Sequence, residues 1–275
     1  MAMPSYATTL DRIWYVTFRV ICCLIFAFLI IPIIVIMPLS FNSEPYFTYP
    51  MPGFSLRWYG DFFSSPQWLL GLQNSIIVGV FATLVATVLG TLAALGLNRA
   101  EYAGKSTILA VLISPIIVPI VITAAGMFYF YAKVGLTGTL AGLVFAHATI
   151  GVPFVVITVS ATLAGFDYNL IRAGASLGGD PLRVFFKITL PLILPGVVAG
   201  ALFAFITSWD ELVIAIFLAS TEEHTLPRRM WSGIRELLSP TIMAVATMLI
   251  LTSIGLMIVM ELLRRRSERL RGITP

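Results

Sequence analysis

Six long stretches of the chain are almost free of charged side chains and are separated by shorter polar segments. Each stretch supplies the roughly 20 apolar residues that a helix needs to cross a hydrocarbon core of about 30 Å. Strands of a membrane barrel would instead alternate in polarity over about 10 residues, so the continuous runs favour helices. The pattern predicts six transmembrane helices, over residues 20–39, 75–97, 107–131, 140–161, 192–218 and 242–263.

The composition agrees with this pattern and excludes a soluble domain. Of the 275 residues, 59% are hydrophobic and only 11% are charged, against about 25% charged in soluble domains. Residues 20–43 carry no charge and are too long for the apolar core of a signal peptide, so they are expected to remain as a first helix. The adjacent Cys22 and Cys23 lie inside that run and are interpreted as packing or lipid-facing residues. The fold class predicted is an all-α polytopic membrane protein.

Lysine and arginine residues fall unevenly on the two sides of the predicted helices. Twelve of the 17 belong to the side that holds both termini and the loop after the fourth helix, and five belong to the other side. The positive-inside tendency therefore predicts cytoplasmic N- and C-termini. The net charge of +4 is explained by this topology, and no nucleic-acid partner is predicted. Residues 264–275 form a basic cytoplasmic tail, interpreted as an anchor at the membrane interface.

The loop between the fourth and fifth helices, residues 165–191, is too polar to cross a membrane. It is nevertheless rich in helix formers, and Asp180–Pro181 predicts an N-cap followed by proline at the first helical position. We expect two short amphipathic helices outside the bilayer.

Small residues in the first short helix form a surface that another molecule could approach closely, and Gly178 with Gly179 predicts a turn. Phe185, Phe186 and Ile188 give the second short helix an apolar face. On the residues alone, two interpretations stay open: docking of a soluble partner, or a helix lying on lipid headgroups as a plain connector. The small residues are Ala173, Gly174, Ala175 and Ser176.

The spacing in this loop resembles the cytoplasmic signature of binding-protein-dependent ABC importer permeases. That signature reads Glu-Ala-Ala, three residues, Gly, nine residues, Ile-x-Leu-Pro, and it is matched here by Ala173, Gly178, Ile188, Leu190 and Pro191. Arg172 stands where the family usually has Glu, and Gly174 stands at the second Ala. The resemblance implies a coupling helix that sits in a groove of the ATPase subunit, formed by Arg172, Ala173, Gly174, Ser176, Leu177, Gly178, Asp180 and Pro181.

Further motifs extend the resemblance to the spermidine/putrescine permease subfamily, in order along nearly the whole chain. They are Ser40-Phe-Asn-Ser, Trp58-Tyr, Pro153-Phe-Val-Val, Gly165-Phe-Asp, Ser208-Trp-Asp-Glu and Leu226-Pro. The resemblance implies the type I importer fold. Residues 1–68 would hold the first helix and an external loop, residues 69–263 the five-helix core, and residues 264–275 the tail.

The same resemblance implies a set of partners in the bacterial inner membrane. They are a second permease subunit, forming a heterodimer, two ATPase subunits, an extracytoplasmic solute-binding protein and membrane lipid. The chain has no Gly-x-x-x-x-Gly-Lys-Ser/Thr phosphate loop, so ATP and Mg²⁺ are expected on the partner ATPase. No cofactor, metal site or catalytic residue is predicted in this chain, and it is expected to be a transport subunit and not an enzyme.

Two carboxylates interrupt the fifth predicted helix. Because a carboxylate at a helix centre costs about 2.5–3.5 kcal/mol, such residues tend to face water-filled paths. We predict a substrate path at Trp209, Asp210 and Glu211, through which a polyamine-like or other small organic cation passes. The alternative for the acidic pair is a structural hydrogen bond or an interfacial position, and the alternative for Trp209 is an ordinary interfacial residue.

Three other functions are alternatives to this one. An opine or an amino-acid-derived solute fits the same permease role. A stand-alone secondary transporter normally shows internal repeats and paired broken helices, which the six spans lack. An intramembrane hydrolase would combine Asp210 with His147, but no nucleophile motif accompanies them, and His147 is interpreted as a packing residue.

Overall fold

The computed structural model describes residues 8–46, 48–99, 101–236 and 239–270, and in these ranges the chain is almost entirely helical. One isolated antiparallel bridge, Asn42 with Phe54, is the only β pairing in the described ranges. The prediction of an all-α fold is confirmed. The helices are α1 (Thr9–Leu39), α2 (Arg57–Ser64), α3 (Pro66–Arg99), α4 (Lys105–Ile117), α5 (Ile120–Val134), α6 (Leu140–Leu163), α7 (Asn169–Ser176), α8 (Pro181–Val184), the π-helical turn η1 (Phe185–Thr189), α9 (Leu190–Trp209), α10 (Val213–Leu218), α11 (Leu226–Glu236) and α12 (Thr241–Leu270).

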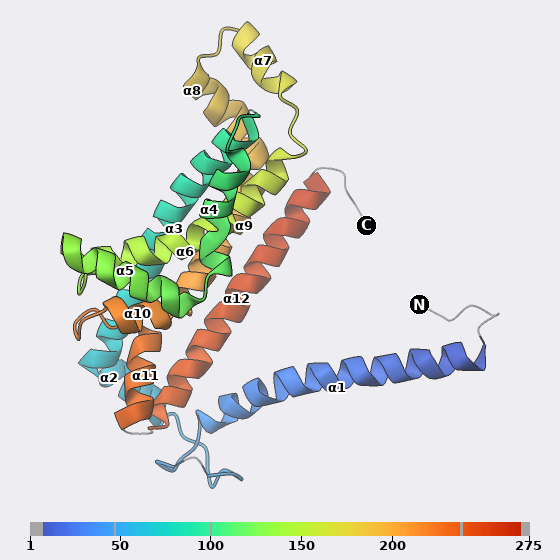
Figure 1. The fold of residues 1–275 in the computed structure, drawn as a ribbon. Helices are drawn as coiled ribbons and strands as arrows, with labels where there is room; N and C mark the ends of the chain where they lie inside the picture. The colour runs from blue at the N-terminus through green and yellow to red at the C-terminus, as the bar shows by residue number, and fades with distance from the viewer. Residues whose placement is uncertain (1–7, 47, 100, 237–238, 271–275) are drawn as a thin grey trace.

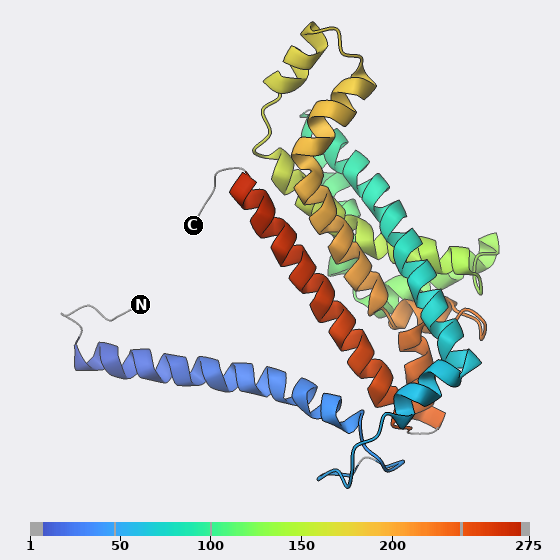
Figure 2. The same cartoon turned by 180° about the vertical axis from the view of Figure 1, so that it is seen from behind.

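The packed centre of the molecule is formed by α3, α6 and α9, which lie side by side (Figures 1 and 2). Small residues allow this close approach. A Cβ atom added at Gly90 would lie 2.6 Å from Val155 Cβ, and one at Gly200 would lie 2.7 Å from Val155 Cα. Since lipid tails are as apolar as leucine, helices in a membrane associate through such close packing and not through burial of apolar surface alone. The three helices therefore form the closely packed core against which other helices of the bundle lie.

Five helices are long and apolar enough to cross a membrane, and the third predicted span is different. It was expected as one helix over residues 107–131, but the structure divides it into α4 and α5, which meet at 107°. Proline causes the break, because Pro119 cannot donate a backbone hydrogen bond and pushes the preceding residue out of the helical region. Val118 is accordingly extended, with ψ of 133°. The third predicted span is therefore this bent pair, and the structure has six spans within its described residues if the pair is counted as one.

The segment before α9 also differs from the prediction. We expected a second separate short helix after Pro181, but α8 continues through η1 directly into α9. The π-helical turn ends at Thr189, two residues before Pro191, whose ring would clash with the carbonyl group four residues earlier in a regular helix. The predicted N-cap is confirmed, since Asp180 accepts a hydrogen bond from the Arg183 backbone N–H at 2.8 Å.

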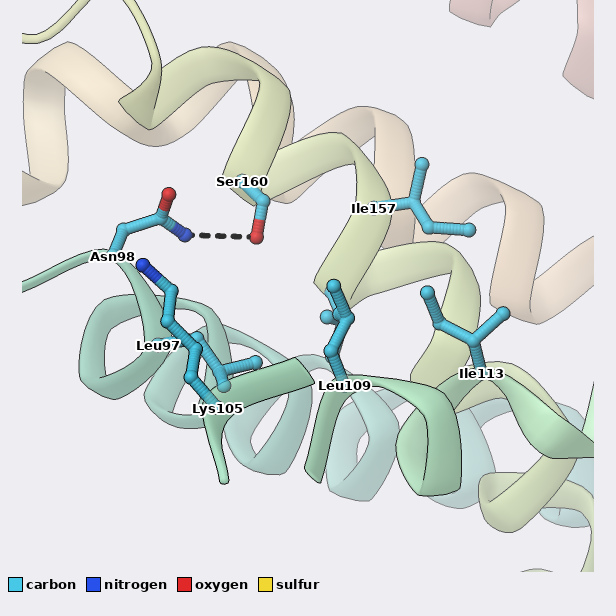
Figure 3. Close-up of a pocket in the computed structure, with 8 residues that line it drawn as sticks. Leu97, Asn98, Lys105, Leu109, Ile113, Ile157 and Ser160 are labelled. Atoms are coloured by element: carbon cyan, nitrogen blue, oxygen red, sulfur yellow. Dashed lines mark hydrogen bonds between the residues drawn. The ribbon is translucent and has the colours of Figure 1, made fainter. Parts of the chain in front are cut away.

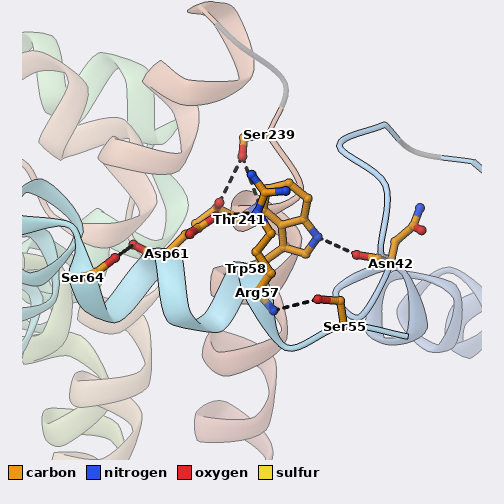
Figure 4. A network of polar contacts seen from close by, with 8 residues as sticks. All are labelled: Asn42, Ser55, Arg57, Trp58, Asp61, Ser64, Ser239 and Thr241. Atoms are coloured by element: carbon orange, nitrogen blue, oxygen red, sulfur yellow. Dashed lines mark hydrogen bonds and ion pairs between the residues drawn. The ribbon is translucent and has the colours of Figure 1, made fainter. Parts of the chain in front are cut away.

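The helix α1 runs away from the bundle, and none of its residues is buried (Figures 1 and 2). It begins earlier than predicted, at Thr9, where Thr8 and Asp11 form a capping box. Its other end is joined to α2 by the Trp58 indole N–H, which donates to the Asn42 carbonyl oxygen at 2.6 Å (Figure 4). Ser40 Oγ also lies 2.7 Å from the Tyr59 hydroxyl oxygen. The motifs Ser40-Phe-Asn-Ser and Trp58-Tyr thus connect the end of α1 to α2, and this connection is called the joint below.

Part of the predicted basic tail lies outside the described residues. Residues 264–270 continue α12, and residues 271–275 are not described.

Candidate functional site

The loop predicted to contact an ATPase projects beyond one end of the bundle (Figure 1). It consists of α7, the turn at 177–180, α8 and η1, and it is called the ledge below. In its turn, Gly178 has φ of +81°, a conformation that favours glycine, and the Gly179 N–H donates to the Gly174 carbonyl at 3.1 Å. These backbone bonds close the C-terminal end of α7 and fix the direction of α8.

Gly174 packs inside the ledge and does not offer its small surface to another molecule. A Cβ atom there would lie 2.6 Å from Ile188 Cδ1 and 3.3 Å from Val184 Cγ2. The small-residue surface expected for a partner is therefore limited to Ala173, Ala175 and Ser176, which are exposed. The glycine serves the internal contact between α7 and the first turns of the long helix.

Large apolar side chains on the ledge point away from the protein. Leu177 is 90% exposed, Leu182 70% and Phe186 60%. Arg172 and Lys187 are exposed as well, and neither forms an ion pair within the part of the chain that the structure describes. Contiguous exposed apolar residues beside cations mark a surface that binds a protein or a membrane.

One hydrogen bond connects the base of the ledge to the bundle. The Tyr168 hydroxyl, directly before α7, donates to the Asn98 carbonyl oxygen near the end of α3 at 3.1 Å. The Asn98 side-chain amide in turn donates to Ser160 Oγ on α6 at 2.9 Å. These two bonds link the base of the ledge to α3 and α6, two of the three core helices.

At the other end of α9, the predicted substrate residues occupy a break between two helices. The helix α9 ends at Trp209 and α10 begins at Val213. Glu211 Oε1 accepts a hydrogen bond from the Ile214 backbone N–H at 2.9 Å, so this carboxylate caps α10. The Asp210 side chain is exposed. The two carboxylates therefore differ: that of Glu211 is bonded to the backbone of α10, whereas that of Asp210 is exposed.

Trp209 lies in a buried cluster between helices. It is only 6% exposed and stacks on Phe205 with ring centroids 5.7 Å apart. The cluster also contains Phe62, Leu226, Val245 and Leu249. The stacked Phe205 occupies one face of the indole, and a role for Trp209 in the substrate path stays a prediction.

The structure brings His147 to the same break, which the sequence did not reveal. His147 is 1% exposed, and its Nδ1 atom lies 2.8 Å from Ser208 Oγ, the first residue of the Ser208-Trp-Asp-Glu motif. The two residues are 61 positions apart, and no spacing rule connects them. Within the described ranges, no group of three His, Cys, Asp or Glu side chains is placed to hold a metal ion.

Comparison with known families places the chain among membrane components of importers. A family model described as "Binding-protein-dependent transport system inner membrane component" matches residues 86–271. The spermidine/putrescine transport system permease protein PotC of Escherichia coli K12 is 32% identical over 250 residues, covering 91% of this chain and 94% of that protein. The putrescine transport system permease protein PotI of the same strain is 34% identical over 244 residues and 86% of each chain.

Solved structures show the same fold at low sequence identity. A bacterial ABC transporter involved in the import of the acidic polysaccharide alginate has a chain that superposes with a TM-score of 0.76 and 18% identity, covering 94% of this chain and 99% of that one. The MetNI methionine ABC transporter gives a TM-score of 0.54 with 21% identity, covering 76% and 97%.

Proposed function

The chain belongs to the family of binding-protein-dependent transport system inner membrane components, and from this premise we propose that it forms half of the translocation path of an ATP-driven importer for a polyamine-like organic cation. It is a multi-pass permease subunit of an ABC importer, and therefore a transport subunit and not an enzyme. The proposal concerns how energy reaches it, what it carries and what it assembles with.

The ledge is proposed to transmit the energy of ATP hydrolysis from a separate subunit. The observation that carries this proposal is the exposure of Leu177, Leu182 and Phe186 at the end of a turn closed by glycine. If the exposed apolar side chains of the ledge bind in a groove of the ATPase subunit, the ledge moves when that groove moves. Its base is bonded to α3 through Tyr168 and Asn98 and continues into α9, so the motion reaches the core. ATP and Mg²⁺ would bind to two partner ATPase subunits.

This role requires that the ledge lies in the cytoplasm. The excess of basic residues on its side of the membrane supports that orientation and cytoplasmic termini. The opposite end of the bundle, with α2, α11 and the joint after α1, would then face the extracytoplasmic solute-binding protein (Figures 1 and 4).

A second permease subunit is proposed to cover much of the apolar surface that remains open. The 31 residues of α1 include none that is buried, although the helix is strongly apolar. Lipid and the partner subunit would share this surface. A pair of permeases over two ATPase subunits would complete the path, of which this chain supplies one half.

For the solute, the polyamine names of the relatives and the open carboxylate of Asp210 favour a cation. An exposed anionic group beside a helix break attracts a positively charged solute and excludes anions. An opine or amino-acid-derived solute is the second candidate, because the binding protein delivers the ligand and is not part of this chain.

Purification of the assembled transporter tests the proposed coupling. Leu177→Asp combined with Leu182→Asp should release the ATPase subunits, because two charges would enter an apolar contact. Leu56→Asp is the matched control, since Leu56 is similarly exposed, at 69%, in the loop leading into α2 at the far end of the bundle (Figure 1). Retention of ATPase by the double variant would refute docking at the ledge.

A further inference from the structure

A narrow cavity opens between α3, α4 and α6 near the end of the bundle that carries the ledge (Figure 3). Its volume is about 260 Å³. One side of it is formed by α4, none of whose residues is buried. The residues around it are Leu97, Asn98, Lys105, Leu109, Ile113, Val156, Ile157 and Ser160, and the cavity is called the slot below.

The walls and the end of the slot differ in chemistry. Five of its eight residues are aliphatic, while Asn98, Lys105 and Ser160 gather at one end, where Figure 3 shows them facing one another. An apolar channel with a polar end fits an amphiphile better than it fits either a polar solute or a plain hydrocarbon. A polyamine would fit poorly, because its charged groups would lie against aliphatic side chains and would be repelled by the Lys105 ammonium.

The polar end is rich in hydrogen-bond donors. The Lys105 ammonium has three donors and uses one on Glu101 Oε1 at 2.6 Å. Ser160 Oγ accepts from the Asn98 amide at 2.9 Å, and within the described residues its own O–H donates no recorded bond. Arg99, exposed at the end of α3, adds a second cation next to Asn98. This arrangement is suited to a phosphate group.

We propose that the slot binds an anionic phospholipid, with one acyl chain between the aliphatic walls and the headgroup phosphate at Lys105 and Ser160. Basic pockets between transmembrane helices bind anionic headgroups in this way. The Glu101 carboxylate competes with a phosphate for the Lys105 ammonium. Its side chain is 90% exposed, so water weakens the ion pair between Glu101 and Lys105.

The bound lipid would lie one hydrogen bond away from the ledge. The carbonyl oxygen of Asn98 accepts from Tyr168 directly before α7, and the amide of the same residue forms part of the slot. Occupation of the slot therefore stabilises the positions of α3 and α6 on which the ledge rests. The site itself does not depend on the proposed transport function, because lipid retention is measured without solute or ATP.

Native mass spectrometry of the complete transporter, released from bilayers of phosphatidylethanolamine and phosphatidylglycerol, tests the proposal. Lys105→Ala should lower retained phosphatidylglycerol by about fivefold, as expected for the loss of one cation. Glu101→Gln frees the ammonium and should raise retention. Ile157→Trp, at a site that is 44% exposed and tolerates a larger ring, fills the slot and should abolish it.

Lys133→Ala serves as the control, since Lys133 is an exposed lysine on α5 away from the slot. Equal retention of phosphatidylglycerol in Lys105→Ala, Glu101→Gln and the unchanged protein would overturn the headgroup assignment. Retention unaffected by Ile157→Trp would overturn the acyl-chain assignment. A crosslink from Leu109→Cys to the second permease would show instead that a protein helix fills the slot, and would equally refute the lipid site.

Discussion

The two ends of α9 are built in opposite ways. At the end that carries the ledge, the helix continues through a π-helical turn into α8, and three large apolar side chains, Leu177, Leu182 and Phe186, are exposed. At the other end the helix stops at Trp209, whose side chain is buried among four other apolar residues. Two polar groups near this second end are bonded within the chain, Ser208 to His147 and the Glu211 carboxylate to the Ile214 N–H.

The contrast is between exposed apolar side chains at the ledge and side chains at the break that are packed or bonded within this chain. Exposed apolar side chains on a turn closed by glycine lose water only when another molecule covers them. Buried aromatic residues and bonded polar groups already hold their positions. Changes at the ledge should therefore act on assembly and coupling, whereas changes at the break should act on solute passage or on stability.

The largest effect is expected for Gly174→Leu. The new side chain would collide with Ile188 and Val184, separate α7 from the long helix and reduce solute uptake in cells to background. Overpacking of this kind costs about 1–3 kcal/mol or more. Gly255→Leu, on an open face of α12, should leave uptake unchanged.

Two smaller substitutions test whether Gly174 is needed for packing within the ledge or for contact with a partner. Gly174→Ala should reduce uptake, and adding Ile188→Ala should restore part of it by removing the atom that the new methyl group meets. Failure of this rescue would show that Gly174 contacts the partner directly.

The next effect concerns the two carboxylates at the break. Asp210→Asn should raise the solute concentration needed for half-maximal uptake about tenfold, because the open anion is removed, which corresponds to about 1.4 kcal/mol. Glu211→Gln should change it less, since the amide oxygen can still cap α10. The measurement is initial uptake of radiolabelled spermidine against concentration. Unaltered uptake in Asp210→Asn with Glu211→Gln would exclude a role for the pair in the path.

A stability effect is expected for the hydrogen bond between α6 and the end of α9. Ser208→Ala leaves a buried histidine nitrogen without a partner, which costs about 1–3 kcal/mol. Thermal unfolding of the purified transporter should shift downward, with Ser160→Ala, in the part-buried bond to Asn98, as the matched comparison of lower cost. A shift no larger in Ser208→Ala than in Ser160→Ala would show that the bond does not stabilise the break.

The smallest effect is expected for Arg172→Glu, which introduces the residue usual in the family. Since Arg172 is exposed and forms no ion pair in the described part of the chain, the fold should be unchanged. An exposed ion pair with the partner is worth about 0–1 kcal/mol, so ATPase stimulation should change by no more than about fivefold. A complete loss of stimulation would place Arg172 at the centre of the contact.

The sequence predicted five of the six spans, the Asp180 cap and a polar loop outside the spans, because each depends on local pattern. A hydrophobic run, or a proline after a capping residue, is defined by residues that are adjacent in the sequence. The break at Pro119 was not predicted, because the apolar run over residues 107–131 is continuous and long enough for one helix. The continuity of α8 with α9 was missed because the charged residues up to Lys187 separated the polar loop from the apolar run over residues 192–218.

Contacts between distant segments could not be predicted. Nothing near His147 in the sequence indicates Ser208, and the inward packing of Gly174 follows only from the fold of α7 over Ile188. The different surroundings of Asp210 and Glu211 also depend on where α10 begins.

Reconstitution into liposomes tests most directly whether the ledge conveys the energy of a separate ATPase. With the second permease, both ATPase subunits, the binding protein and ATP present, the transporter should accumulate spermidine against its gradient, and Leu177→Asp with Leu182→Asp should abolish accumulation. The chain without ATPase subunits should not accumulate it. Accumulation by that chain alone would contradict the account.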